Sequence, residues 1–302
     1  MSVLVVGSVA LDTVKTPFGF QREVLGGSAT YFSMAASFFT KVKVVAVIGT
    51  DFDENHFKLF KKRGVDWSGI ERKPGKSFRW EGEYRDDINT AITKKTSLNV
   101  FREFDPVLPG KYRGSRTVFL ANIDPDLQMK VLGQIRLPKL VVCDTMNFWI
   151  ENKSDSLRKM ISHVDILLMN DGEVRQFTGE ANLFKAVRAV LKLGPRTVVV
   201  KRGEFGAMMF HGNTIFAVPA FPLDRAVDPT GAGDSFAGGF VGYLSGKKAL
   251  TVDHLRQAVV FGSVMASFAV QGFSIDSFRT LTHEKIRERY RQFKELTSFR
   301  SL

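Results

Sequence analysis

Cysteine is nearly absent from this 302-residue chain, which contains one, Cys143. A single cysteine excludes a disulfide within the chain, and its place after the apolar run 140–142 indicates a buried packing residue. No apolar run approaches the roughly 20 residues that a membrane-spanning helix needs, and the first residues do not resemble a secretory signal. We therefore expect a cytoplasmic protein that engages no membrane.

Several familiar functional motifs are also missing. There is no Gly-x-x-x-x-Gly-Lys phosphate loop, no Gly-x-Gly-x-x-Gly dinucleotide fingerprint and no Gly-x-Ser-x-Gly nucleophile elbow. The histidines are too scattered in the sequence to indicate a metal site. They are His56, His163, His211, His254 and His283.

The chain is strongly basic, with 43 Lys and Arg against 31 Asp and Glu and a formal charge of +12. Such a charge suits a polyanion, because nucleic acids release counterions when basic surfaces bind them. However, acidic residues are interspersed among the basic ones, and no basic tail or zinc-finger spacing occurs. We expect no nucleic-acid partner. The charge suits a small anionic substrate equally well.

Strand-like and helical patterns alternate along the chain. Apolar runs without polar alternation, typical of strands buried on both faces, occur at residues 3–6, 42–48, 117–120, 140–142, 166–169 and 197–200. Helical patterns lie between them at 28–39, 51–63 and 181–193. This order predicts an α/β fold in which a doubly wound, mostly parallel sheet is flanked by helices. We expect one domain over residues 1–302.

Two segments, from about 12–24 and 76–103, break that pattern because apolar and polar residues alternate in them. A period of two indicates strands with one solvated face. We expect a small antiparallel β lid near the carboxyl ends of the first strands, where open α/β sheets bind ligands. Open lid edges often pair with a second copy, so a homodimer through the lid is a hypothesis.

The stretch 228–240 carries the clearest chemical signal. Gly231, Ala232 and Gly233 have little or no side chain, and a helical pattern follows to about residue 245. Their backbone N–H groups could approach an anion closely at the positive end of the helix dipole. Asp234 would repel phosphate there unless it accepts a proton from an attacking hydroxyl. Alternatively, Asp234 is a first-turn acid that only favours the helix.

Residues 228–240 resemble, position for position, the carboxyl-terminal signature of the ribokinase-like PfkB kinases, and the resemblance extends over almost the whole chain. It implies a ribokinase-like fold and transfer of the ATP γ-phosphate to a hydroxyl of a sugar or nucleoside. In this family the Gly-Ala-Gly backbone stabilises the transferred group and the aspartate deprotonates the acceptor. These roles would fall to Gly231, Ala232, Gly233 and Asp234.

The resemblance also implies an acceptor site near the start of the chain. It assigns acceptor contacts to Asp12 and to Gly26-Gly27-Ser28, where glycines allow a close backbone approach. Many family members have an asparagine four residues after the second glycine, whereas this chain has Tyr31, so the acceptor stays open. Asp12 could instead be a turn residue at a strand end.

Further polar residues follow other strands. Asn170 and Glu173 resemble the family's Asn-x-x-Glu motif, which holds the water shell of magnesium near ATP, and they also fit a helix capping box. Asn122 and Asp144 follow two buried strands and are candidates for acceptor binding or for turns.

The nucleotide side of the site resembles the family's Thr-x-Gly segment. Gly203 and Gly206 match it, and Lys201 stands in the threonine position. Thr230, beside the glycine motif, is a further nucleotide-binding candidate. Some family members bind a monovalent cation near the segment of Asp228 and Thr230, which leaves such an ion open here.

Our first interpretation is therefore an ATP- and magnesium-dependent sugar kinase. A nucleoside kinase is an alternative, because Phe78, Trp80 or Tyr84 on the lid could stack a base. A catalytically silent ligand-binding protein on the same scaffold is another, since a fold alone does not establish activity. The intact Gly-Ala-Gly-Asp core argues against silence.

Overall fold

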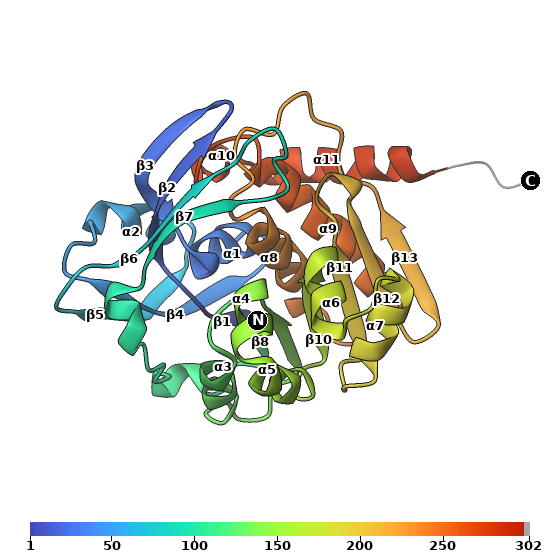
Figure 1. Ribbon diagram of the computed structural model, residues 1–302, viewed down its shortest axis with the longest axis horizontal. Coiled ribbons are helices and arrows are strands. Elements are labelled where there is room, and N and C mark those ends of the chain that lie inside the picture. Colours follow the sequence, from blue (N-terminus) through green and yellow to red (C-terminus); the bar gives the residue numbers. More distant parts are fainter. Residues whose placement is uncertain (299–302) are drawn as a thin grey trace, which may run out of the picture.

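A nine-stranded sheet forms the centre of the protein, for which a computed structural model describes residues 1–298 (Figure 1). Its strand order is β13-β12-β11-β10-β9-β8-β1-β4-β5, parallel from β11 to β5 and antiparallel at β12 and β13. The strands are β1 (Ser2–Val6), β4 (Lys41–Gly49), β5 (Asp66–Lys73), β8 (Thr117–Leu120), β9 (Leu140–Asp144), β10 (Ile166–Asn170), β11 (Thr197–Lys201), β12 (Ala207–His211) and β13 (Thr214–Val218).

Helices cover both faces of this sheet, as the doubly wound pattern predicts. They are α1 (Ser28–Ala36), α2 (Phe57–Lys62), α3 (Pro125–Leu132), α4 (Asn147–Asn152), α5 (Ser154–Ile161), α6 (Asp171–Thr178), α7 (Leu183–Leu191), α8 (Ala232–Ser245), α9 (Val252–Ala269), α10 (Asp276–Arg279) and α11 (His283–Thr297). The expected helix at 51–63 is shorter, because Asp53 accepts a hydrogen bond from the Asn55 amide and caps a 3-10 turn before α2.

Alternate side chains of each central strand pack into two separate hydrophobic cores, one on each face of the sheet. Val3 and Val5 of β1 pack into the core beneath α1, α8 and α9, whereas Leu4 and Val6 pack into the core beneath α3, α5, α6 and α7. This explains why the strands lack polar alternation. In the first core α8 lies against α1 so closely that a Cβ at Gly238 would sit 2.5 Å from the Phe32 carbonyl.

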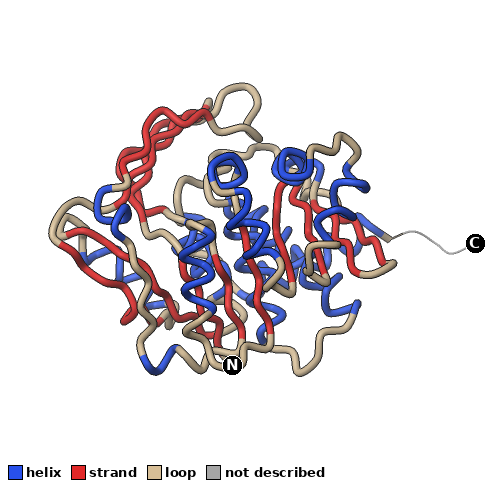
Figure 2. Tube along the Cα trace, turned by 60° about the horizontal axis from the view of Figure 1, so that its bottom comes forward, coloured by secondary structure: helices blue, strands red, loops and turns tan. Residues whose placement is uncertain are grey.

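A second sheet stands off the main one as the lid (Figure 2). Its order is β3-β2-β6-β7, from β2 (Ala10–Thr16), β3 (Gly19–Gly26), β6 (Phe78–Glu83) and β7 (Ile92–Ser97). β2–β3 and β6–β7 are antiparallel pairs, as expected, and β2 pairs with β6 in parallel. The parallel pair arises because β2 and β6 continue from β1 and β5, which run in the same direction in the main sheet.

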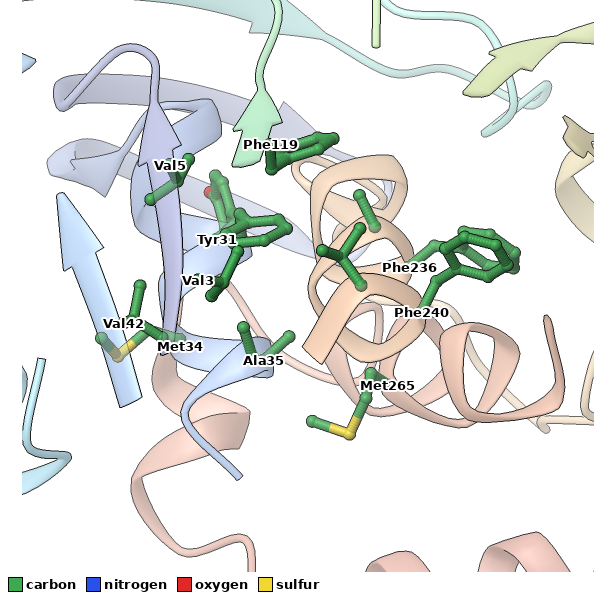
Figure 3. Close-up of a cluster of buried hydrophobic side chains, with 14 of the residues drawn as sticks. Val3, Val5, Tyr31, Met34, Ala35, Val42, Phe119, Phe236, Phe240 and Met265 are labelled. Atoms are coloured by element: carbon green, nitrogen blue, oxygen red, sulfur yellow. The ribbon is translucent and has the colours of Figure 1, made fainter. Parts of the chain in front are cut away.

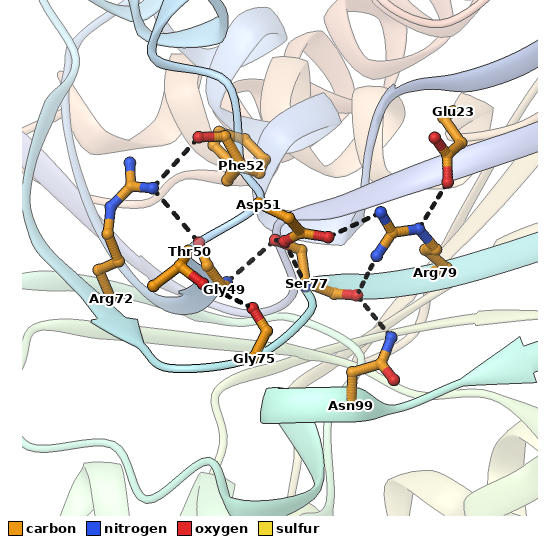
Figure 4. A network of polar contacts seen from close by, with 10 residues as sticks. All are labelled: Glu23, Gly49, Thr50, Asp51, Phe52, Arg72, Gly75, Ser77, Arg79 and Asn99. Atoms are coloured by element: carbon orange, nitrogen blue, oxygen red, sulfur yellow. Dashed lines mark hydrogen bonds and ion pairs between the residues drawn. The ribbon is translucent and has the colours of Figure 1, made fainter.

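Ion pairs and hydrogen bonds fix the root of the lid to the main sheet (Figure 4). Arg79 of β6 donates to Glu23 of β3 at 2.7 Å and pairs with Asp51 at 2.7 Å, just beyond β4. Asp51 also accepts from the Ser77 amide at 2.7 Å. The lid therefore has a rigid root at the edge where the parallel strands end, which places its inner face over that edge.

Candidate active site

The site begins at the amino end of α8, where the chain makes a tight turn over an aromatic ring. Gly231 has a left-handed backbone, with φ of 73°, and a Cβ there would lie 2.2 Å from the ring of Tyr31. Only glycine meets both demands. Tyr31 is 1% exposed and lies in the core beside α8 (Figure 3). The sequence showed that Tyr31 departs from the family pattern but not that it supports this turn.

The first amides of α8 are only partly used by the protein. The Ala232 N–H donates to the Pro229 carbonyl at 3.1 Å, and the Ser235 N–H donates to the Gly231 carbonyl at 2.8 Å. Within residues 1–298 the Gly233 and Asp234 amides have no protein acceptor. An anion at this helix end would find free N–H groups and the positive end of the helix dipole. We expected Ala232 to contribute, yet its amide serves the turn.

Asp234 lies in the first turn of α8, near enough to Asp144 and Lys201 for their charges to affect it. Burial raises the pKa of Asp234 to about 7; the nearby charge of Asp144 raises it further and Lys201 opposes the shift. A carboxyl group with a pKa near 7 is suited to proton transfer at neutral pH. The interpretation of Asp234 as a mere first-turn acid does not explain this environment.

Lys201 and Asp144 form a buried ion pair next to the amides. The Lys201 Nζ lies 2.7 Å from Asp144 Oδ2, and a Cβ at Gly233 would be 3.1 Å from the same Nζ. Burial alone would lower the pKa of Lys201, but Asp144 and Glu173 raise it above its ordinary value, so the ammonium stays charged. Asp144, expected to contact the acceptor, is thus placed as a counter-ion of Lys201.

Asn170 and Glu173 form the capping box that their spacing predicts. The Asn170 amide donates to Glu173 Oε2 at 2.7 Å, and the Glu173 amide donates to Asn170 Oδ1 at 2.7 Å. Burial raises the pKa of Glu173 to about 7, against the lowering effect of Lys201. No cluster of three or more metal-ligating side chains occurs in the described part of the chain, so these residues do not form an all-protein metal cage.

Asp12 faces the same site from the lid. Its carboxylate lies against Gly26, where a Cβ would come within 1.9 Å of Oδ2. Burial raises the pKa of Asp12 to about 7; a hydrogen bond from the Gly27 backbone opposes this, and Asp228 and Asp234 add to it. Asp12 and Asp234, 222 positions apart in the printed sequence, are therefore electrostatic neighbours. This supports the interpretation of Asp12 as a site residue rather than a turn.

Tyr84 closes the lid onto the turn before α8. The Thr230 hydroxyl donates to the Tyr84 oxygen at 3.3 Å, and the Thr230 amide donates to Asp228 Oδ1 at 2.9 Å. Asp228, which is fully buried, also accepts from the Ser274 amide at 3.2 Å. Thr230 is thus held between the lid and the helix start. Sequence spacing gave no signal for the contribution of Ser274.

The lid also reaches the loop expected to bind nucleotide. Asn89, in the turn between β6 and β7, accepts from the Glu204 amide at 3.2 Å and donates to Glu204 Oε1 at 3.1 Å. Gly203 has φ of 54°, and a Cβ there would lie 2.2 Å from Asn89 Oδ1. Gly206 instead packs against the Val218 carbonyl. One lid hairpin therefore touches both the acceptor side and the nucleotide side.

Two expected acceptor residues are occupied within the protein. Asn122 accepts from Trp149 Nε1 at 2.8 Å and donates to the Met146 sulfur at 3.0 Å. The Ser28 hydroxyl accepts from the Ser8 amide at 3.2 Å. Both side chains brace loops around the site in this structure.

Comparison with known proteins identifies the family of this chain. The model of the pfkB family carbohydrate kinases matches residues 3–277. A cytidine kinase from Thermococcus kodakarensis is 30% identical, covering 82% of this chain and 90% of its own, and an inositol 3-kinase from Arabidopsis thaliana is 28% identical, covering 97% and 80%. The structure of a Burkholderia thailandensis nucleoside kinase in complex with inosine superposes with a TM-score of 0.80 at 18% identity, covering 96% of each chain.

The chain therefore belongs to the pfkB family of carbohydrate kinases. The fold class expected from the sequence is confirmed, as is the enzyme class, a sugar or nucleoside kinase that phosphorylates an alcohol group. None of the helices in residues 1–298 is both long and apolar enough to cross a bilayer.

Proposed function

We propose that this kinase transfers the γ-phosphate of ATP to a hydroxymethyl group of a nucleoside. The observation that carries the choice of acceptor is on the inner face of the lid. Asp12 of β2 is the register partner of Trp80 of β6, so both side chains leave the lid on the same face. A carboxylate beside an indole suits a ribose hydroxyl beside a base.

The other two aromatic residues of β6 are engaged in packing. Phe78 lies against Phe101 with ring centroids 5.3 Å apart, and the Tyr84 hydroxyl meets Thr230. Trp80 is half-buried, its ring covers Gly82 and its Nε1 donates to Thr93 at 3.2 Å. Trp80 is therefore the aromatic side chain we assign to base stacking.

In the proposed reaction Asp234 accepts the proton of the acceptor hydroxyl as its oxygen attacks the γ-phosphorus. The bond from that phosphorus to the β–γ bridging oxygen breaks, giving ADP and the phosphorylated acceptor. The backbone amides of Gly233 and Asp234 donate hydrogen bonds to the phosphoryl oxygens and so stabilise their negative charge. Lid closure excludes water, which prevents ATP hydrolysis and strengthens each electrostatic contact.

The nucleotide is assigned to the loop with Gly203 and Gly206 and to Lys201 and Thr230. Asn170 and Glu173 offer oxygen donors, which Mg²⁺ prefers, and two such residues suit an ion that keeps most of its waters. When bound with ATP, magnesium would neutralise charge on the phosphates. A cytoplasmic location fits this substrate.

An acceptor panel tests the proposed function. Purified protein is incubated with ATP and Mg²⁺ and with cytidine, uridine, adenosine, inosine, ribose, fructose or myo-inositol, and ADP is measured with the phosphorylated product. We expect at least one nucleoside to exceed every free sugar and polyol by about tenfold or more in kcat/KM. Turnover of a sugar alone would refute the nucleoside assignment, and no transfer to any acceptor with a folded protein would refute the proposal as a whole.

A Trp80→Leu variant narrows the test to the lid. Loss of stacking is expected to raise the nucleoside KM by roughly 10-fold, because base–aromatic stacking contributes about 1–3 kcal/mol. The KM for ATP should change little. Phe20→Leu, on an exposed lid residue, is the matched control. An unchanged nucleoside KM in Trp80→Leu would refute the stacking of Trp80 on the base.

The homodimer through the lid stays a prediction. β3 and β7 are the lid's edge strands, and Phe18, Phe20 and Ile92 on or next to them are exposed. Exposed strand edges with apolar side chains favour pairing with another chain. Small-angle scattering should give the mass of a dimer, and a monomer at about 100 µM would contradict this arrangement.

A further inference from the structure

Lys201 occupies an unusual place for a lysine. It ends β11, its side chain is 16% exposed, and its partner Asp144 ends β9 with 4% exposure. A lysine at such a position loses hydration, so the ion pair is a poor device for stability alone; apolar replacements of buried pairs are often neutral. Something other than folding energy has to account for a cation here.

The surroundings of the ammonium group indicate what it serves. The negative charges of three carboxylates raise the pKa of Lys201. They belong to Asp144, Glu173 and Asp234. If all three are ionised, the site carries more negative than positive charge, which would repel a phosphoryl group. Lys201 offsets part of that charge beside Gly233, at the helix end that presents free amides.

We propose that Lys201 is a catalytic residue whose ammonium group contacts the migrating phosphoryl group at the start of α8, while Asp144 acts as the counter-ion that positions it. This inference rests on the proposed function and extends it by giving Lys201 a role in the transfer step. A neutral side chain at this position could offer at most a hydrogen bond. An ammonium ion offers a full charge, which matters most where charge develops during transfer.

The contribution of Lys201 is specific to the transfer step. As the new bond from the acceptor oxygen to phosphorus forms and the bond to ADP breaks, Asp234 holds the released proton and the three equatorial oxygens carry negative charge. Lys201 keeps its proton and moves no electrons. It should therefore bind the transition state more tightly than it binds the ground-state nucleotide.

The direct variant, Lys201→Met, keeps the length of the side chain and removes the charge. It also leaves Asp144 buried without its partner, which strongly destabilises the fold. The informative variant is therefore Lys201→Met/Asp144→Asn, in which no lone buried charge is left at this pair. Thermal unfolding should show the double variant more stable than Lys201→Met.

The matched control is Arg202→Met, which removes one positive charge from the adjacent residue. The Arg202 guanidinium lies against the Met208 sulfur at 3.8 Å and over the Phe205 ring. Its turnover should stay within about threefold of wild type. Asp144→Asn alone retains the Lys201 charge and should lose less turnover than either variant that lacks Lys201.

Two measurements on the double variant decide the proposal. We expect kcat to fall by about 10²–10³-fold, the scale for loss of one transition-state donor, with the acceptor KM within about threefold. Calorimetry with Mg²⁺ADP and with Mg²⁺ADP–aluminium fluoride, each with acceptor present, should show that the aluminium fluoride complex loses at least tenfold more affinity than ADP does.

The inference is overturned if the folded double variant turns over within threefold of wild type, or if both ligands lose affinity equally. The first result would make Lys201 structural, and the second would make it a general nucleotide contact. Either outcome leaves the proposed function intact as long as the wild-type protein transfers phosphate in the same assay.

Discussion

Replacing Asp234 by asparagine should lower activity and raise stability in the same molecule. The variant keeps the shape of the side chain but cannot accept the acceptor's proton, so turnover is expected to fall by about 10³-fold or more, at the upper end of general-base effects. Nucleotide binding should persist, because the substitution leaves the backbone amides of residues 233 and 234 in place.

The stability gain follows from the raised pKa. Burial moves the pKa of Asp234 from 3.8 to about 7, so the folded state binds this proton more tightly than the unfolded state does. The stability gained from this tighter proton binding by Asp234 is complete below about pH 4 and is lost as the pH rises through about 7. Above pH 7 the ionised group destabilises the fold by up to about 4 kcal/mol at 1.36 kcal/mol per unit. Partial exposure of Asp234 reduces this figure, and we expect Asp234→Asn to gain about 1–3 kcal/mol.

Urea unfolding at pH 8 and pH 5, together with turnover at pH 8, measures both effects. Asp234→Asn should be more stable than wild type at pH 8, and the difference should shrink at pH 5. Asp253→Asn is the control, because this side chain is 81% exposed beside Arg256. Near-normal turnover of Asp234→Asn would refute the assignment of Asp234 as the general base. Unchanged stability at both pH values would refute the buried-charge argument.

Three further predictions concern pH, the helix turn and the lid. The logarithm of kcat/KM for wild type should fall with a slope near one below about pH 7, because Asp234 must be ionised to take the proton; a flat profile from pH 5 to 8 would contradict this. Gly231→Ala should lose about 2 kcal/mol or more in urea unfolding, since its backbone is left-handed and its Cβ would enter the Tyr31 ring; Gly246→Ala, at an ordinary helix end, is the control. Asn89→Ala should speed hydrogen exchange at residues 86–90 by breaking both contacts to Glu204; unaltered exchange there would refute the contact in solution.

The central strands and the helix start at α8 were accessible from sequence because their signals are local. Each buried strand is mostly an apolar run, and Gly231 to Asp234 lie next to one another. β5 and β13 were not predicted for the opposite reason. β5 is an edge strand with mixed polarity, and β13 alternates with one exposed face, so neither shows the buried pattern. β12 was also not predicted, although its residues 207–210 are apolar.

The contacts that define the site could not be predicted because they join distant residues. Lys201 meets Asp144 across 57 positions, and Asn89 meets Glu204 across 115. Spacing contains no information on such pairs. The pairing of Asp12 with Trp80 likewise depends on the register of two lid strands from separate parts of the chain. The sequence thus predicted a role for Asp234 in proton transfer, whereas the structure supplied its neighbours.

The account depends most on where the phosphate binds, and a crystal structure with a non-hydrolysable ATP analogue, Mg²⁺ and a nucleoside would test that directly. We expect the γ-phosphate within about 3 Å of the Gly233 amide and the acceptor hydroxyl within hydrogen-bond reach of the Asp234 carboxylate, near 2.6–3.2 Å. A γ-phosphate bound away from the start of α8, or an acceptor that does not reach Asp234, would contradict it.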